Sequence, residues 1–431
     1  MTRAGTIAAG LVLLIGSGAP GPEPEPEQKL RPADGTSQTE FGSSVAIDGD
    51  LMVVGARLSD DLGRNSGAAH VFLRTAGAWQ QESTLLPVDG VVDQQFGISV
   101  DIDDGTAVVG AWRDDDNGLY SGSAYVFERT RGSWLQQAKL LPSDGSALDE
   151  FGRRVTVDGE TIGVASGFDD DNGPSSGSVY IFVRRGNHWA EQAKLVPADG
   201  QPSDVFGSDI DIDGETVIIG AALDDDQGND SGSAYVFVRS GSEWMQQAKL
   251  KPEDGNAGAR FGSSVALDGD TAVIGSPEDN DNGFQSGSAY VFVRTNGVWS
   301  QKGKLLGADV DRGDEFGASV SISGNAAVVG APLDSDPTIS AGSAYLFALA
   351  GGEWTEQAKI LAQDGAWTDH FGSAVALDCA TLVISSPDND ESGPNAGAAY
   401  VFRTGRARCV DELYKEGDAT WQPRSSSRVT R

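Results

Sequence analysis

The residues of this sequence that most clearly suggest a chemical function are aspartates that occur in dense clusters, because such clusters can bind a cation. Four acidic segments end in glycine: residues 114–118 (DDDNG), 169–173 (DDDNG), 224–228 (DDDQG) and 279–283 (DNDNG). Adjacent carboxylates repel one another unless water or a cation relieves the charge, and Ca²⁺ takes six to eight oxygen ligands. The segments therefore predict calcium sites with the ligands Asp114, Asp116, Asp169, Asp171, Asp224, Asp226, Asp279 and Asp281. The open alternative is a set of solvated turns in which Asp and Asn hydrogen-bond to their own backbone.

The acidic segments lie 55 residues apart, and so do the landmarks around them. A Phe-Gly pair recurs at Phe41, Phe96, Phe151, Phe206, Phe261, Phe316 and Phe371. A second phenylalanine keeps the same step at Phe72, Phe127, Phe182, Phe237, Phe292, Phe347 and Phe402. A period of this length indicates a solenoid, a propeller or an array of repeats.

Each repeat contains four segments with the pattern of short strands. Residues 41–47 (FGSSVAI) and 51–56 (LMVVGA) flank a tight Asp-Gly turn, which is typical of a hairpin. Segments such as 287–294 (GSAYVFVR) and 134–141 (WLQQAKLL) give the third and fourth strands. No segment places apolar residues at helical spacing. The sequence therefore predicts an all-β fold, a seven-bladed β-propeller of four-stranded antiparallel blades.

Short triplets at the end of the second strand carry a family resemblance. They are Gly55-Ala56-Arg57, Gly110-Ala111-Trp112, Ala165-Ser166-Gly167, Gly220-Ala221-Ala222, Gly275-Ser276-Pro277, Gly330-Ala331-Pro332 and Ser385-Ser386-Pro387. With the Phe-Gly pairs, they make the chain resemble the FG-GAP repeat proteins, which include the propeller of integrin α subunits. The calcium motif of integrin-type propellers lies between the first and second strands. Here that connection is only Asp-Gly-Asp, so the family's calcium ligands have no counterparts in this chain.

The ends of the chain predict how the ring closes. Residues 28–30 (QKL) match the fourth-strand motif at 138–140 (AKL), and the repeat pattern fails after Phe402. We therefore expect residues 28–32 to supply the last strand of the seventh blade, because closure removes an exposed sheet edge. The expected organisation is a signal peptide at 1–19, a Pro/Glu linker at 20–27, the propeller at 28–404 and a disordered tail at 405–431.

Residues that break the repeat predict the binding surface. The candidate ligand-binding residues are Trp112, Arg113, Tyr120, Phe168, Phe284 and Trp367. All of them fall between strands two and three or between successive blades, and these two connections emerge on the same face of an up-and-down blade. Binding residues gather on such loops. Arg153 and Arg154 also depart from the pattern, since they replace small residues beside the channel.

Composition and charge limit the classes of function. The formal net charge of −33 opposes binding to nucleic acid. The signal peptide predicts a secreted or extracytoplasmic protein, and the alternative for residues 1–19 is an uncleaved membrane anchor. We expect a monomer with no membrane insertion of the mature chain. The two cysteines, Cys379 and Cys409, predict a disulfide in an exported protein.

The sequence favours a binding or adhesion module over an enzyme. The three histidines, His70, His188 and His370, fall in different blades and at different positions of the repeat, and no nucleophile motif or phosphate loop is present. We expect the module to recognise a protein or a glycan, with calcium as its only cofactor. The alternatives are a glycan-active enzyme that uses the same face and a structural component of a matrix or surface layer.

Overall fold

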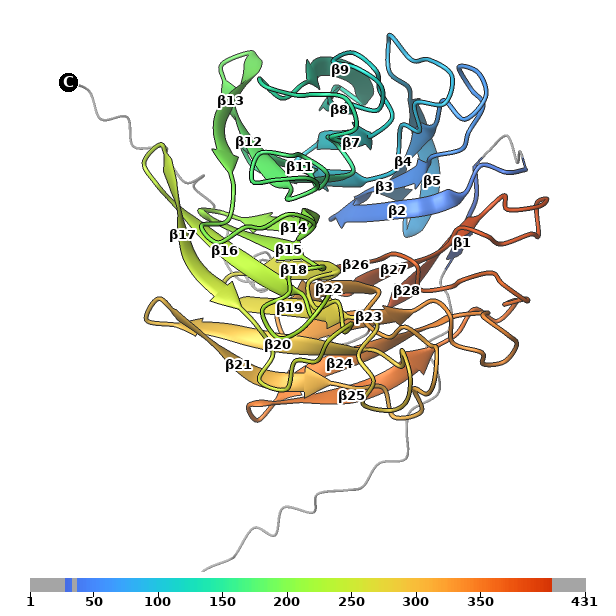
Figure 1. Cartoon of the computed structure of the whole chain (residues 1–431). Coiled ribbons are helices and arrows are strands. Elements are labelled where there is room, and N and C mark those ends of the chain that lie inside the picture. Colours follow the sequence, from blue (N-terminus) through green and yellow to red (C-terminus); the bar gives the residue numbers. More distant parts are fainter. Residues whose placement is uncertain (1–27, 33–36, 405–431) are drawn as a thin grey trace, which may run out of the picture.

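The computed structural model describes residues 28–32 and 37–404 of the chain. These residues form a seven-bladed β-propeller in which every blade is a four-stranded antiparallel sheet. Figure 1 shows the seven sheets around a central axis, with the sequence running round the ring. The described residues contain no helix, so the predicted fold class is confirmed.

The first six blades place their strands in sequence order from the channel outward, and in the seventh the outermost strand comes from the N-terminus. The innermost strands are β2 (Phe41–Asp48), β6 (Val100–Asp103), β10 (Arg154–Asp158), β14 (Phe206–Asp213), β18 (Ser264–Asp268), β22 (Ser319–Ser323) and β26 (Val375–Asp378). The second strands are β3 (Leu51–Ala56), β7 (Thr106–Ala111), β11 (Thr161–Ser166), β15 (Thr216–Ala221), β19 (Thr271–Ser276), β23 (Ala326–Ala331) and β27 (Thr381–Ser386).

The third and fourth strands complete the blades. The third strands are β4 (Ala68–Thr75), β8 (Ser123–Thr130), β12 (Ser178–Arg185), β16 (Ser233–Ser240), β20 (Ser288–Thr295), β24 (Ser343–Ala350) and β28 (Ala398–Arg403). The outermost strands are β5 (Ala78–Leu85), β9 (Ser133–Leu140), β13 (His188–Leu195), β17 (Glu243–Leu250), β21 (Val298–Leu305) and β25 (Glu353–Ile360), with β1 (Gln28–Leu30) in the seventh blade.

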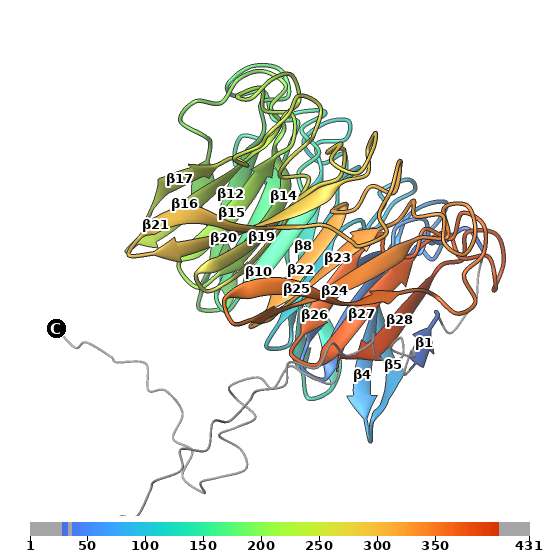
Figure 2. The same cartoon turned by 90° about the horizontal axis from the view of Figure 1, so that it is seen from below.

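The hydrophobic core lies between neighbouring blades. In one cluster, Val126 of the second blade packs with Phe151 and Tyr180 of the third. The ring of Phe151 meets those of Tyr180 and Phe182 edge-on, at centroid distances of 5.4 and 6.1 Å, and such pairs stabilise beyond their buried area. Because each interface needs the same rings, the repeated aromatic residues are explained by packing. Figure 2 shows how closely the sheets follow one another round the ring.

A glycine that recurs in the blades allows neighbouring blades to approach each other closely, at the end that carries the loops after the second strands. Gly122 has φ +82°, and a Cβ there would lie 2.0 Å from the carbonyl oxygen of Phe151 in the next blade. A side chain is therefore excluded by both backbone conformation and space. The Ser-Gly-Ser pattern of the sequence follows from this contact.

The N-terminal strand closes the ring. β1 pairs with β28 in antiparallel register, with Lys29 opposite Tyr400, and Figure 1 shows β1 beside β28 where the two ends of the ring meet. Leu30 is buried. The side chain of Gln28 exchanges two hydrogen bonds with the backbone of Trp79 in the first blade (2.7 and 2.8 Å). The strand expected from residues 28–32 therefore exists, and it also ties the seventh blade to the first.

Candidate functional site

Two sets of loops share one end of the propeller. The loop after each second strand bonds through its backbone to the following interblade loop: Phe96 N–H donates to Ser66, Phe151 to Ser121 and Phe316 to Ser286, each at 3.0 Å. The six candidate ligand-binding residues lie in these loops. The structure thus places them on one face, as the topology of an up-and-down blade requires.

Five residues of the second and third blades form an arginine–aromatic cluster: Trp112, Arg113, Tyr120, Arg153 and Phe168. The Arg113 guanidinium lies over Trp112 at 4.3 Å and over Tyr120 at 5.2 Å from the ring centroids. Arg153 lies over Trp112 at 5.4 Å and over Phe168 at 5.2 Å. Guanidinium groups and rings therefore alternate, each contact adding cation–π attraction. The structure brings together four of the six candidates and adds Arg153.

Phe284 and Trp367 lie outside this cluster. Phe284 is 59% exposed, and the guanidinium that lies over its ring belongs to Arg312. Trp367 is 67% exposed, in the loop before the seventh blade. These two aromatic residues enlarge the apolar part of the face, but they belong to other blades than the cluster.

A pocket opens beside the cluster at the mouth of the channel. Its volume is about 280 Å³, and it is lined by Glu40, Ser43, Arg57, Ile98, Trp112, Arg153, Arg154 and Pro387. Trp112 is fixed there by a hydrogen bond from its Nε1 to Gln95 (2.9 Å). Three guanidinium groups and one carboxylate thus face a small space in a protein whose net charge is −33.

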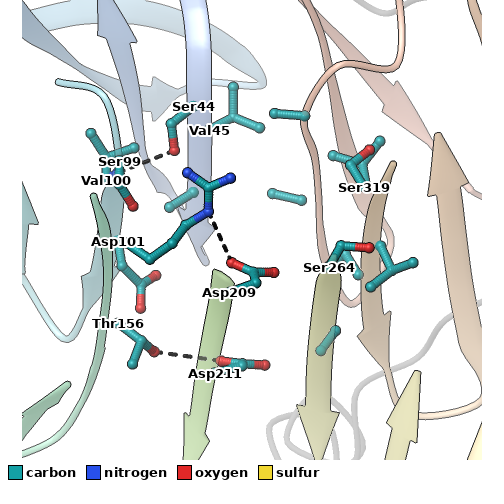
Figure 3. Close-up of a pocket in the computed structure, with 18 of the residues that line it drawn as sticks. Ser44, Val45, Ser99, Val100, Asp101, Thr156, Asp209, Asp211, Ser264 and Ser319 are labelled. Atoms are coloured by element: carbon teal, nitrogen blue, oxygen red, sulfur yellow. Dashed lines mark hydrogen bonds and ion pairs between the residues drawn. The ribbon is translucent and has the colours of Figure 1, made fainter. Parts of the chain in front are cut away.

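The channel below the mouth has one charged wall. Asp101, Thr156, Asp209 and Asp211 lie on one side of it, and Ser264 and Ser319 lie opposite (Figure 3). Arg154 forms an ion pair with Asp209 at 3.3 Å. Confinement away from water raises the pKa of Asp101 to about 7. The pKa of Asp211 is also raised, first by the same confinement and then by the negative charge of Asp101.

The channel carboxylates also bond to the neighbouring blade. Asp101 accepts the N–H of Val157 and Asp211 that of Leu267, both at 2.7 Å. Serines do the same elsewhere, as when Ser99 accepts the N–H of Val155 at 3.1 Å. These hydrogen bonds give the channel carboxylates a structural role that needs no ligand.

The predicted calcium ligands converge on a lysine ammonium. In the second blade, Lys139 Nζ lies 2.9 Å from Asp114, 2.7 Å from Asp116 and 2.7 Å from Asp89 of the preceding interblade loop. Burial alone would raise the pKa of Asp114, but hydrogen bonds from Lys139 and Ser123 outweigh it and lower that pKa. The ammonium therefore supplies the positive charge that the carboxylates need.

This arrangement recurs in most blades, and we call it the lysine-bridged loop. Its lysines are Lys139, Lys194, Lys249, Lys304 and Lys359, with Lys29 of β1 in the seventh blade. The remaining predicted ligands meet them: Asp169 and Asp171, Asp224 and Asp226, Asp279 and Asp281. Within residues 28–32 and 37–404, no three His, Cys, Asp or Glu side chains are grouped to hold a metal ion. Calcium binding stays a prediction.

The first blade carries the sequence signal that reveals this network. Ser59, His70 and Thr84 occupy the positions that hold Asp114, Tyr125 and Lys139 in the second blade. All three residues differ in the first blade, and in the second blade they touch: Tyr125 donates to Asp114 at 2.9 Å, and Lys139 lies over the Tyr125 ring. Comparing these three positions across the blades would have identified lysine as the partner of the acidic loops.

Some predictions fall on residues outside the described part of the chain. Cys379 lies in the turn between β26 and β27, but Cys409 lies outside the described residues, so their pairing stays a prediction. The signal peptide at 1–19, the linker at 20–27 and the tail at 405–431 are likewise not described. In the described part, no helix is long and apolar enough to cross a membrane.

Comparison with known proteins identifies the repeat. A family model for the FG-GAP repeat matches residues 25–72, 79–127, 134–182, 189–237, 244–292, 299–347 and 354–402. Most of these windows run from the outermost strand of one blade through the third strand of the next, and the first contains β1 and then β2 to β4. The closing strand is thus the opening strand of the first repeat.

One relative is an integrin by name. Over 233 residues the chain is 26% identical to human integrin alpha-11, a match that covers 47% of this chain and 19% of the integrin. The chain therefore corresponds to about a fifth of that relative.

Proposed function

Since the chain belongs to the FG-GAP repeat family, we propose that it is an exported module that binds a protein or a glycan. Binding takes place on the face that carries the loops after the second strands and the interblade loops. The proposal extends to this chain the adhesive role of integrin subunits, one of which is its relative. Secretion or display outside the cytoplasm is part of the same proposal.

The arginine–aromatic cluster is the observation that carries this proposal. Trp112, Tyr120 and Phe168 are half-buried in loops, whereas the aromatic residues of the repeat pattern are needed between blades. Trp, Tyr and Arg are the residue types that dominate the energy of protein interfaces. A cluster of them on exposed loops of a rigid ring favours recognition of a macromolecule.

The test is a screen of protein and glycan arrays with the full chain, followed by variants. Trp112→Ala combined with Tyr120→Ala should abolish capture of whichever ligand is found. Met245→Ala is the control, because Met245 is also exposed (57%) but lies on the outermost strand β17. Equal capture by the double variant and the parent would refute this face as the binding surface.

Calcium assistance is tested in the same screen. An ion at the acidic loops would have to displace the lysine ammonium, so we expect capture and melting temperature to be insensitive to a chelator. If a chelator lowered the melting temperature, mass action would require an ion bound to the folded state. That result would support the calcium sites predicted from the sequence.

A second candidate function is a glycan-active enzyme that uses the channel. The raised pKa of Asp101, about 7, favours it, because general acids are tuned to that range. Hydrolysis of a panel of polysaccharides by the parent, lost in Asp101→Asn, would establish this function. We favour binding, since the carboxylates of Asp101 and Asp211 are engaged in bonds to backbone N–H groups.

A further inference from the structure

We propose that the pocket at the channel mouth receives a single carboxylate side chain, Asp or Glu, from a protein partner. The inference rests on the proposed function and specifies the chemistry of its ligand. The pocket is lined by Arg57, Arg153 and Arg154 together with Trp112 and Glu40. Arginine recognises carboxylates through paired N–H donors, and this geometry gives both strength and orientation.

The arginines are the exposed members of their ion pairs. Arg57 is 35% exposed and its partner Glu40 only 14%. Arg153 is 43% exposed and Glu150 16%, while Arg154 is 38% exposed and Asp209 22%. Glu40 shares the lining of the pocket, but each guanidinium group is more exposed than its partner, so an approaching ligand meets more guanidinium than carboxylate surface.

The guanidinium groups keep donors for a ligand. Each has five N–H donors. The ion pairs use Nε of Arg57, one terminal nitrogen of Arg153 and Nε of Arg154, and Nη1 of Arg154 also donates to the carbonyl of Arg153. Arg153 is also held between Trp112 and Phe168. A guanidinium that is already ordered loses less freedom when a carboxylate binds.

The positive lining is confined to one sector of the ring. At the repeat position of Arg57, the fifth to seventh blades carry Pro277, Pro332 and Pro387, and at the position of Arg154 the same blades carry Ser264, Ser319 and Ala374. Blades with Pro, Ser or Ala at these two positions form without an arginine there, so packing does not require three guanidinium groups at one small opening, although each of them pairs with a carboxylate. Their concentration in an acidic protein is what a site for a negative group needs.

The surroundings favour a protein over a saccharide as the source of the carboxylate. Two guanidinium groups lie over the Trp112 ring, which leaves little of it for stacking on a sugar. Leu119 and Leu148, 55% and 56% exposed, lie together on the adjoining loops, where the N–H of Leu148 donates to the carbonyl of Leu119 at 2.8 Å. Apolar side chains around an arginine–aromatic centre are typical of protein interfaces.

The experiment titrates the full chain with capped Gly-Asp-Gly, capped Gly-Asn-Gly and trigalacturonate. Ligand-observed NMR measures the binding of each compound. We expect the Asp peptide to bind in the millimolar range and the Asn peptide not to bind. Arg153→Gln and, separately, Arg57→Gln should each weaken binding of the Asp peptide about tenfold. Arg239→Gln is the matched control, because Arg239 forms an ion pair with Glu215 on the opposite face. Melting curves confirm that each variant is folded.

Each outcome decides the inference. Equal binding of the Asp and Asn peptides, no binding of either, or unchanged binding in both arginine variants would overturn the carboxylate pocket. Binding of trigalacturonate alone would assign the pocket to an acidic saccharide and overturn the choice of a protein. These titrations do not use the ligand found on the arrays. The carboxylate pocket can therefore be refuted while Trp112 and Tyr120 still prove necessary for capture, and it can be supported even if they do not.

Discussion

The lysine-bridged loops and the arginine–aromatic cluster use similar residues for different ends. In the loops, Lys304 is enclosed by three carboxylates, and its side chain is 15% exposed. In the cluster, Arg153 lies between aromatic rings and is 43% exposed. The loop network recurs round the ring, whereas the cluster occurs in the second and third blades. Repetition with burial marks a structural role, and departure from the repeat with exposure marks a candidate binding site.

Carboxylates alone do not distinguish a metal site from an internal ion pair. The acidic loops hold the ligand types that calcium prefers, but a lysine 25 residues further along the chain reaches them, as Lys304 reaches Asp279. A metal site and an internal ion pair both place a positive charge beside the carboxylates, and in this structure the lysine ammonium lies there. The same charge pattern in a sequence therefore predicts a metal site or an internal ion pair, depending on which lysine folds back.

The largest loss of thermal stability is expected when the N-terminal strand is deleted, because this strand supplies the lysine of the seventh blade's loop. Deleting residues 28–32 removes Lys29 from Asp364 and Glu391 and leaves the edge of β28 unpaired. The melting temperature should fall by several degrees, or the protein should aggregate on heating. Thermal melts with light scattering measure both, and a matched deletion of residues 20–24 is the control. A closed ring that melts like the parent would show that β1 contributes nothing to closure.

Removal of one bridging lysine tests the structural half of the comparison. Lys304→Met leaves the buried carboxylate of Asp279 without its counter-ion, which should cost about 3 kcal/mol of unfolding free energy. Lys251→Met is the control, because Lys251 pairs with Asp226 at the surface and is 38% exposed. Urea melts give both values. If the two variants lost equal stability, the lysine-bridged loops would be ordinary surface ion pairs.

A pH profile distinguishes the aspartates that have a lysine from those that lack one. Burial raises the pKa of Asp149, Asp204 and Asp314 to about 6 and confinement raises that of Asp101 to about 7. The folded-state pKa of these four carboxyl groups exceeds the unfolded value, so the folded state favours their protonated form. Their contribution to the unfolding free energy is therefore complete below about pH 4 and is lost as pH rises through 6 to 7. Asp114 and Asp279 have lowered pKa values and contribute above their unfolded pKa, losing this below about pH 4.

The two trends place maximum stability on the acidic side of neutrality. Acidification from about pH 7.5 to about pH 5.5 should raise the unfolding free energy by about 2 kcal/mol, measured by urea melts across the range. Asp101→Asn should flatten the upper part of the profile, because it removes the group that titrates near pH 7. A stability that rises steadily from pH 5 to pH 8 would contradict the assignment.

The smallest effect is expected in the arginine–aromatic cluster. Arg113→Gln removes two cation–π contacts and no ion pair that the described residues form, so it should cost only about 1 kcal/mol of stability. Capture of the array ligand should nevertheless fall, because the rings of Trp112 and Tyr120 lose the group between them. A loss of stability as large as that of Lys304→Met would mean that the cluster is part of the structural framework.

The sequence alone determined the fold, the number of blades and the closing strand. A period of 55 residues with four strand patterns per period leaves few architectures, and the displaced QKL motif shows which terminus completes the last blade. The loop face was also predictable, since successive connections in an antiparallel blade alternate between its two ends. These conclusions rest on local patterns that a linear sequence displays.

Only the tertiary structure decided what the charged residues do. Lys139 and Asp89 are 50 residues apart, and Arg57 and Arg154 belong to different blades, so their meeting depends on how the blades curve and pack. Spacing along the chain could not show that Lys139 Nζ lies 2.9 Å from Asp114, and calcium binding at this loop stays a prediction. The pocket at the channel mouth arises for the same reason, from arginines of the first and third blades that line one opening in the folded ring.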